Sequence, residues 1–234
     1  MWMGIDGCRG GWVIASMPAD SSRVVDIEIE VAPRLEAPLL NGELSVALID
    51  MPVGLLSDRS RQIETLARRA LPGQASTVFN VPVADAVYAS SYPEASALNA
   101  RHTGKKLSKQ AWYLCPKIRE LNELLAAQPA LASKVFESHP EIVYRQWVGQ
   151  RLPKKKTAEG ERARVEFLRS VGVPVDRLVR DVSTRYPKRV VLIDDVLDAL
   201  VLLLLATRPS RDLDPAPQIA LTGCPINLRV PGTG

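Results

Sequence analysis

The chain has 234 residues, of which 46% are hydrophobic and 24% are charged. This balance is typical of a globular protein with its own hydrophobic core, and it excludes a disordered or fibrous chain. The formal net charge of +4 at pH 7 is compatible with a polyanionic partner but does not indicate one, because many solvated surfaces carry such a bias.

The cysteines and the apolar stretches indicate in which compartment of the cell the protein is expected. Cys8, Cys115 and Cys224 are far apart, which argues against a disulfide framework or a structural zinc site and favours a reducing, cytoplasmic location. The sequence does not begin with a basic segment followed by an apolar run, so we expect no signal peptide. The apolar stretch at residues 196–206 is shorter than the roughly 20 residues of a membrane span, and it predicts a buried helix with no membrane partner.

The N-terminal part of the chain has the pattern of a small sheet. A glycine-rich turn separates apolar runs at residues 3–7 and 12–17, and residues 23–31 alternate apolar and acidic side chains. These three segments predict an antiparallel meander. A short helix is expected at residues 33–40, and the continuous apolar run at residues 44–50 is typical of a strand buried on both faces.

The rest of the chain is mostly helical. A long helix from Ser108 is expected to be bent or interrupted at Pro116. We read the whole chain, residues 1–234, as one α/β domain with a helical insertion at about residues 72–130. The other expected elements are helices at residues 59–71, 93–101, 141–149, 157–171 and 194–207, a loop-rich part at 72–92, a strand at 134–137 and a strand pair within 218–230.

Acidic residues end several apolar segments. Asp6, Asp50 and Glu137 end three predicted strands, and Asp195 and Asp198 share one face of the last helix. If the strands of Asp6 and Asp50 are parallel neighbours, their ends bring two carboxylates together, and a helix packed on that sheet can add Asp195 or Asp198. Each acid alone is also explained as a turn or cap residue, although Asp198 interrupts an apolar helix, where an unpaired carboxylate is costly.

Clustered carboxylates repel one another unless a cation lies between them. Hard divalent cations prefer such oxygen ligands, and two ions about 4 Å apart can stabilise the attacking and leaving oxygens of a phosphodiester displacement. We therefore predict a site for Mg²⁺ or Mn²⁺. Its predicted ligands are Asp6, Asp50, Asp195 and Asp198.

Several basic side chains are candidates for substrate binding. Arg9 lies in the glycine-rich turn, and Lys105 and Lys117 flank an aromatic pair, which suits phosphate contact and base stacking or, equally, a solvated helix with its aromatic side chains in the core. His139 either orients a carboxylate, shuttles a proton or caps the following helix. The segment "PKKKTAEGERAR" is interpreted as a solvated loop and helix start whose lysines can still touch a phosphate.

The segments "GIDGCRGGW", "IDMPVGL", "FESHPEIVYRQWVG", "KKKTAEGERAR" and "DDVLDALVLLLLA" resemble successive blocks of a predicted-nuclease family with a ribonuclease H-like fold, catalogued as domain of unknown function 429. The resemblance runs from Gly4 to about Arg208. It implies a mixed five-stranded sheet flanked by helices, in which the first three strands are antiparallel and the later ones parallel. Relatives often carry Asp where this chain has Glu64, so Glu64 and Arg68 are either members of the site or part of a solvated helix face, and the solvated face is the favoured interpretation.

The resemblance also implies site residues. In ribonuclease H-like nucleases the first-strand Asp corresponds to Asp6, and the acid ending the next central strand corresponds to Asp50. The segment "DDVLDAL" is similar to the C-terminal helix of Holliday-junction resolvases, with Asp195 and Asp198 as the metal-facing acids. Glu137 matches the glutamate of the block before "HPE", which places it beside the same site as a catalytic acid.

Three functions are compatible with these observations. The leading hypothesis is a divalent-metal-dependent phosphodiesterase, a nuclease that uses clustered carboxylates to activate water and has nucleic acid as its partner. The first alternative is a nucleotide-binding phosphotransferase or ATPase of the related actin-like fold, with "GIDGCRGG" as a phosphate-binding hairpin, although the sequence has no second element of this kind. The second alternative is a non-catalytic binding protein, and a homodimer is compatible with each.

Overall fold

The computed structural model describes residues 1–21 and 24–232. They form two compact units, each made of segments that are separated in the sequence. The first unit consists of Met1–Asp50, Lys134–Arg211 and Arg229–Gly234, and the second of Met51–Ser133 and Asp212–Leu228. The helical insertion predicted at about residues 72–130 falls within the second unit, whose bounds are wider.

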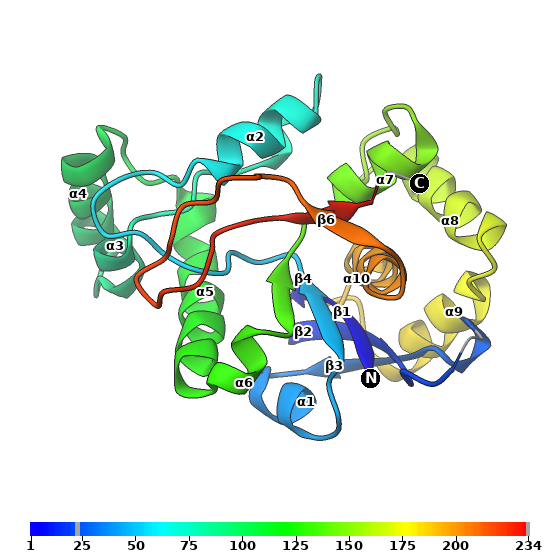
Figure 1. Cartoon of the computed structure of the whole chain (residues 1–234). Helices are drawn as coiled ribbons and strands as arrows, with labels where there is room; N and C mark the ends of the chain where they lie inside the picture. The colour runs from blue at the N-terminus through cyan, green and yellow to red at the C-terminus, as the bar shows by residue number, and fades with distance from the viewer. Residues whose placement is uncertain (22–23, 233–234) are drawn as a thin grey trace. The chain divides into compact units, whose positions relative to one another are not determined.

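The first unit is built on a mixed sheet of five strands in the order β3-β2-β1-β4-β5 (Figure 1). The strands β1 to β3 pair antiparallel, whereas β4 pairs parallel with β1, and β5 parallel with β4. The mixed sheet predicted from the sequence is therefore confirmed. The strand bounds are Trp2–Cys8 for β1, Gly11–Met17 for β2, Glu28–Ala32 for β3, Val46–Ile49 for β4 and Val135–Glu137 for β5.

The antiparallel meander predicted at the start of the chain is present, but its third strand begins later in the sequence than expected. Gly11 enters β2 with a φ of +128°, a conformation that glycine adopts without a steric penalty. The alternation at residues 23–31 suggested one continuous strand, but Val24–Asp26 forms a 3₁₀ turn (η1) before β3 begins at Glu28. The Ser21 hydroxyl donates to the Asp26 carboxylate over 2.6 Å, which favours this turn. Arg23 lies outside the described residues.

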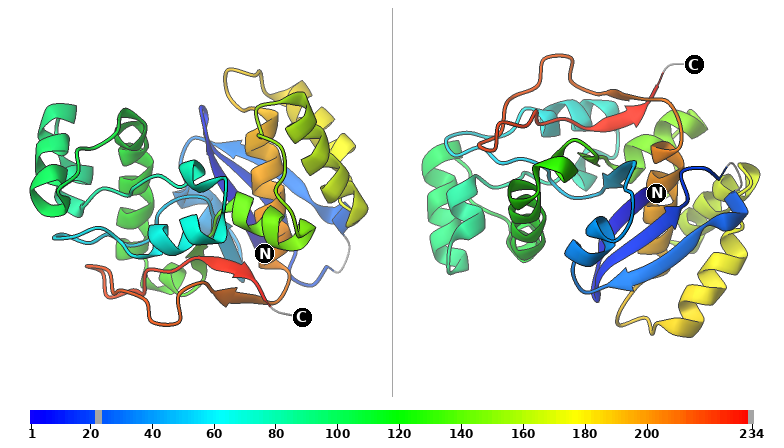
Figure 2. Two further views of the ribbon diagram at one scale, coloured as in Figure 1. Left: turned by 90° about the horizontal axis from the view of Figure 1, so that it is seen from above. Right: turned by 60° about the horizontal axis from the view of Figure 1, so that its bottom comes forward.

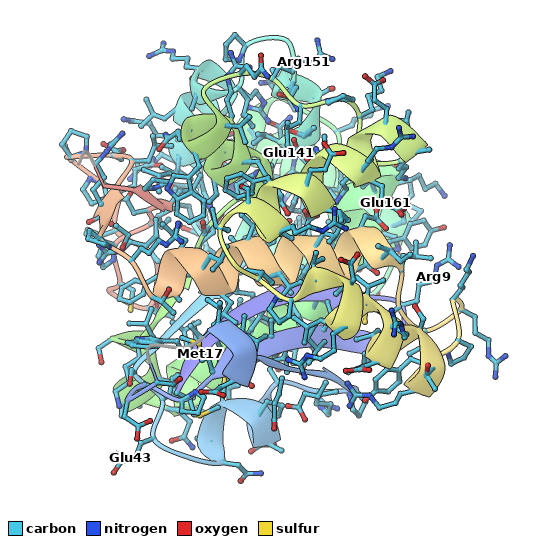
Figure 3. The ribbon with its side chains drawn as sticks, turned by 90° about the vertical axis from the view of Figure 1, so that its right-hand side faces the viewer. Arg9, Met17, Glu43, Glu141, Arg151 and Glu161 are labelled. Atoms are coloured by element: carbon cyan, nitrogen blue, oxygen red, sulfur yellow. The ribbon has the colours of Figure 1, made fainter. Side chains whose placement is uncertain are left out.

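Helix α10 is the central helix of the first unit, and ten of its side chains are buried. It packs against β1, β2 and β4, and Figure 3 shows it lying along the strands with α8 and α9 beside it. The sequence analysis did not predict α9, although its buried residues Val175, Leu178 and Val182 follow a helical spacing. The helices of this unit are α1 (Glu36–Leu40), α7 (Pro140–Val148), α8 (Ala158–Ser170), α9 (Val175–Arg185) and α10 (Ile193–Ala206).

The second unit is mainly helical. Helices α3, α4 and α5 pack together around a small apolar cluster (Figure 2). The expected interruption at Pro116 is wrong, because α5 continues through this proline as one helix of 19 residues. The elements of this unit are α2 (Ile63–Ala70), η2 (Ala75–Thr77), α3 (Ala84–Tyr88), α4 (Tyr92–Thr103), α5 (Lys109–Ala127) and α6 (Pro129–Ala132).

The interpretation of Glu64 as part of a solvated helix face is wrong. Glu64 is only 6% exposed, and its carboxylate lies 2.8 Å from the guanidinium of Arg61, which is also buried. Arg61 donates in turn to the carbonyl of Gly54. A buried carboxylate needs such a partner, so α2 uses this acid to pack rather than to face water.

The strand pair predicted within residues 218–230 is only partly correct. A two-stranded sheet does form near the end of the chain, but its members are β6 (Ser210–Asp212) and β7 (Arg229–Pro231). Between them the chain has a single antiparallel bridge, from Ile219 to Pro225, which is flanked by hydrogen bonds from the Ala220 N–H to the Cys224 carbonyl and from the Ile226 N–H to the Gln218 carbonyl. Of the helices in the described residues, none has the length and apolarity that would let it cross a membrane.

Candidate functional site: a buried carboxylate cluster beside a lysine

The sheet register sets Asp6 and Asp50 next to each other. In the parallel pair of β1 and β4, Gly4 is opposite Leu48 and Ile5 is opposite Ile49. The pairing continues one step further, because the Asp50 N–H donates to the Ile5 carbonyl over 2.9 Å. Asp6 and Asp50, which are far apart in the sequence, therefore lie opposite each other on neighbouring strands. This is the position expected from the sequence if the two strands are parallel neighbours.

Helix α10 brings the third carboxylate, that of Asp198. Gly4 and Asp6 point to the same face of β1, because alternate residues of a strand share a face. A Cβ atom at Gly4 would lie 2.1 Å from the backbone of Ala199 and of Leu203, so the helix backbone rests directly on the strand there. One helical turn from Leu202 back to Asp198 rises about 6 Å, close to the rise of about 6.6 Å from Gly4 to Asp6. The close approach at Gly4 therefore brings Asp198 alongside Asp6.

The three acids form a compact group. One carboxylate oxygen from each of Asp6, Asp50 and Asp198 lies within 4.8 Å of the others, and no other such group of three metal-ligating side chains occurs in residues 1–21 and 24–232. Asp6 is 7% exposed and Asp198 only 1%. The cluster is thus shielded from most of the water that would screen its charges.

Burial and mutual repulsion raise the pKa of each acid. Burial and then the charges of Asp50 and Asp198 raise the pKa of Asp6 well above its usual range. Burial raises the pKa of Asp50, although the charges of His139 and Lys155 oppose that shift. Burial raises the pKa of Asp198 to about 6, against the opposing effect of Lys155. The cluster therefore favours a positive charge in its midst.

Lys155 supplies one such charge. Its Nζ atom lies 2.6 Å from Asp198 Oδ2 and donates to it. The charges of Asp198, Asp6 and Asp50 raise the pKa of Lys155 above its usual range, against the effect of burial. The sequence analysis interpreted the segment of Lys155 as a solvated loop, which is wrong for this side chain.

The residues present fit a divalent cation. Asp198 Oδ1 is buried and has no hydrogen-bond partner among the described residues, whereas Oδ2 of the same side chain is bound to Lys155. A buried carboxylate oxygen without a partner is costly, and a cation would satisfy it. Three carboxylates are also the hard oxygen donors that Mg²⁺ and Mn²⁺ prefer.

The segment that carries Lys155 is held by the helix that follows it. The N–H and the hydroxyl of Thr157 both donate to the Lys154 carbonyl, over 2.9 and 2.8 Å. The same hydroxyl accepts from the Gly160 N–H and so caps α8. A Cβ at Gly160 would lie 2.1 Å from the Lys154 carbonyl oxygen, so only glycine allows the segment to pack this closely.

A buried arginine completes this arrangement. Arg164, in α8, is 1% exposed and donates to the Pro153 carbonyl over 3.0 Å. It also forms an ion pair of 2.5 Å with Glu141 in α7, and its guanidinium lies 5.3 Å from the centre of the Tyr144 ring. Figure 3 labels Glu141 near α8. The sequence analysis missed Arg164, and the signal that could have found it is an arginine on the face of α8 shared with Gly160 and Leu168.

Glu137 and Asp195 do not join the three carboxylates. Glu137 pairs with Ile49, which pairs with Ile5, so these residues share a row of the sheet. Asp6 is one residue further along and therefore points to the opposite face, because side chains alternate along a strand. Asp195 accepts from the Leu192 N–H over 3.0 Å and so caps the start of α10. Asp195 thus caps α10 and, like Glu137, lies outside the group of three acids, and the roles expected of Asp195 and Glu137 stay predictions.

The predicted substrate-binding residues have different positions. Arg9 is exposed at the turn between β1 and β2 (Figure 3). Burial raises the pKa of Asp195, and the charge of Arg9 is one of the effects that oppose this shift. His139 begins α7 without a side-chain cap, so the capping interpretation is wrong, and its charge acts on Asp50 instead. Lys105 and Lys117 belong to the second unit, whereas all members of the carboxylate cluster belong to the first.

The comparisons with known proteins give one family and no individual relative. Neither the curated proteins nor the solved structures contain a match to this chain. The family described as "Protein of unknown function (DUF429)" matches residues 4–218, a range that includes Asp6, Asp50, Lys155 and Asp198. Because this match spans most of the sequence, the chain belongs to the DUF429 family.

Proposed function

We propose that the first unit is a divalent-metal-dependent phosphodiesterase that hydrolyses nucleic acid. The observation that carries this proposal is the group of three carboxylates, two of them buried and that of Asp50 half-buried, in which one oxygen of each lies within 4.8 Å of the others. Such a group repels itself unless a cation is bound, and a cation held by carboxylates is the usual means of activating water against a phosphodiester.

The strand order supports a ribonuclease H-like scaffold for this activity. Three antiparallel strands lead into two parallel ones in the order β3-β2-β1-β4-β5, and Asp6 lies near the end of β1 while Asp50 directly follows β4. This is the arrangement that the resemblance to ribonuclease H-like nucleases implies. The actin-like alternative is a related fold, but it needs a second phosphate-binding hairpin, which the sequence lacks.

In this proposal the three acids share the binding of the metal ion, and two basic side chains have other roles. Asp6, Asp50 and Asp198 would hold Mg²⁺ or Mn²⁺, which would supply an acidified water and stabilise charge that develops on the phosphate. His139 favours the ionised form of Asp50, because its charge lowers the pKa of that carboxyl. Arg9, exposed at the turn that follows Asp6, is positioned to contact a phosphate of the substrate.

The test is cleavage of labelled nucleic acids by the purified full chain with Mg²⁺ or Mn²⁺. The panel contains single-stranded DNA and RNA, duplex DNA, flaps and four-way junctions, and ATP is assayed in parallel. We expect cleavage of at least one nucleic acid, and we expect Asp6→Asn to reduce its rate at least about 10²-fold. Asp181→Asn, which makes the same chemical change at an exposed position of α9, is the matched control and should leave the rate unchanged.

Three results would contradict the proposal. Full activity of Asp6→Asn would show that the carboxylate cluster does not carry the reaction. Hydrolysis of ATP together with intact nucleic acids would instead favour the phosphotransferase alternative. If the wild-type chain cleaves no nucleic acid and Mn²⁺ does not change its melting temperature, the carboxylate cluster has only a structural role.

A further inference from the structure

Lys155 places a cation within a group of carboxylates that could hold two metal ions. The inference drawn from it rests on the proposed function, and it concerns how many metal ions the site uses. We propose that the Lys155 ammonium takes the place of a second divalent cation, so that the site binds one Mg²⁺ or Mn²⁺ and Lys155 contacts the reacting phosphate from the other side.

The first support is the charge of the cluster. The ionised carboxylates of Asp6, Asp50 and Asp198 carry three negative charges, and Lys155 contributes one positive charge. One divalent cation then neutralises the group, whereas two would leave it with an excess of positive charge. Two further acids act on the cluster. Glu141 is paired with Arg164, and Asp195 accepts from the Leu192 N–H and lies near the positive charge of Arg9.

The second support is the way in which Asp198 divides its two oxygens. Oδ2 accepts from Lys155 over 2.6 Å, and Oδ1 is buried without a hydrogen-bond partner among the described residues. In two-metal sites the ions lie about 3.5–4 Å apart on either side of the reacting phosphate. Asp198 can span the same gap here, with the ammonium on one oxygen and a metal ion on the other.

The third support is the rigidity of the segment that carries Lys155. The carbonyls of Pro153 and Lys154 are bound by Arg164 and Thr157, and Gly160 lets the segment pack against α8. A lysine that only neutralised surface charge would not need the carbonyls of the two preceding residues to be held in this way. The ammonium is thus oriented before substrate arrives, which is what a group that stabilises developing charge requires.

The chemistry of lysine suits this position. An ammonium offers three donors and no acceptor, so it can bind Asp198 and still donate to a phosphate oxygen. The Lys155 side chain keeps 35% of its surface exposed, which leaves it open on one side, whereas the Asp198 side chain is 2% exposed. Neighbouring Lys154 and Lys156 are exposed and have the same charge, which makes Lys156 a matched control.

The experiment counts bound metal in the full-length chain by titration calorimetry with Mn²⁺ alone. We expect one ion per wild-type chain and two per chain of Lys155→Met, because the methionine keeps the length of the side chain and removes its charge. Lys155→Arg, which keeps the charge, and Lys156→Met should both bind one ion. In Mg²⁺, Lys155→Met should also lose about 10²-fold or more in cleavage rate and recover part of it in excess Mn²⁺.

Each outcome decides the inference. Two ions in the wild-type chain would overturn it, and so would unchanged stoichiometry and unchanged cleavage in Lys155→Met. Tighter Mn²⁺ binding by Lys155→Met with undiminished cleavage would show that Lys155 merely competes with the metal, which also overturns it. If Lys155→Met does not fold, the wild-type count and Lys155→Arg remain decisive. One bound ion without cleavage of any nucleic acid would contradict the proposed function but not the single-ion site.

Discussion

A Cβ atom added at Gly4 would lie only 2.1 Å from the backbone nitrogen of Leu203. Helix α10 can therefore approach β1 this closely only because position 4 has no side chain. Since Asp6 follows Gly4 on the same face, this contact also sets the separation between the carboxylates of Asp6 and Asp198. The packing of the core and the geometry of the site depend on the same residue.

We expect Gly4→Ala to destabilise the first unit strongly. The added methyl group meets the helix backbone rather than a side chain that could rotate away, so α10 must move. A loss of at least about 3 kcal/mol in the free energy of unfolding is expected, at the upper end of overpacking effects. Urea unfolding of the wild type and the variant measures it, and a loss below about 1 kcal/mol would contradict the close approach.

Asp50 and Glu137 end neighbouring strands but point to opposite faces, so their neutral variants should differ. Asp50→Asn should abolish the rise in melting temperature that Mn²⁺ produces, because the variant loses a ligand. Glu137→Gln should keep that rise and keep the Mn²⁺ affinity within a factor of about two, since independent sites do not couple. Thermal scans with and without Mn²⁺ compare the two, and equal losses would refute the assignment of the faces.

The stability of the metal-free protein should fall as the pH rises. The pKa of Asp198 is raised from 3.8 to about 6 in the folded protein, so folding favours the protonated form. Its contribution is fully present below pH 4 and is lost as the pH rises through about 6, a change on the order of 3 kcal/mol for such a shift. The raised pKa values of Asp6 and Asp50 act in the same direction.

This pH dependence is measured by urea unfolding in chelator between pH 4 and pH 8, with Asp198→Asn as the reference. The variant should lose part of the slope. Because a cation favours the ionised acids, Mn²⁺ should stabilise the protein more at pH 8 than at pH 5. A wild-type protein whose stability rises over the same interval, at the same slope as Asp198→Asn, would refute the prediction.

Removing the buried guanidinium of Arg164 should affect both stability and the site. Arg164→Met leaves Glu141 buried without its partner, which typically costs about 3–5 kcal/mol. The double variant Arg164→Met with Glu141→Gln should recover much of this loss, because the remaining acid is then neutral. Both variants also release the Pro153 carbonyl, so we expect cleavage to stay impaired in the double variant even where stability returns. Full recovery of both would show that Arg164 does not position the Lys155 segment.

Much of the sheet was predictable from local patterns. Glycine-rich turns and apolar runs with acids at their ends predicted the meander and the strand that ends at Asp50, because these signals depend on neighbours in the sequence. The parallel pairing of that strand with the first was anticipated only as a condition. The register of β4 with β5 places Glu137 opposite Ile49 rather than opposite Asp50. Such a register depends on pairing between distant segments and could not be predicted from either strand alone.

The candidate site shows the same division. The acids Asp6, Asp50 and Asp198 were recognisable because a carboxylate in an apolar segment is unusual. Asp195 shares a helix face with Asp198, and only the hydrogen bond from Leu192 distinguishes the cap from the cluster. Lys155 was missed because a run of lysines usually faces water, and its burial follows from the packing of Gly160 and Arg164 in the next helix.

The carboxylate cluster also has a consequence for the order of events during synthesis. Its three acids come from β1, from the end of β4 and from α10. Asp6 and Asp50 are therefore synthesised early, and Asp198 only near the end of translation. A nascent chain that has not yet produced α10 lacks Asp198 and the helix that rests on Gly4. Such a chain cannot assemble the site, however well its first hairpin has formed. Because these segments are far apart in the sequence, the proposed metal ion could be bound, and the proposed hydrolysis could begin, only after the first unit has folded.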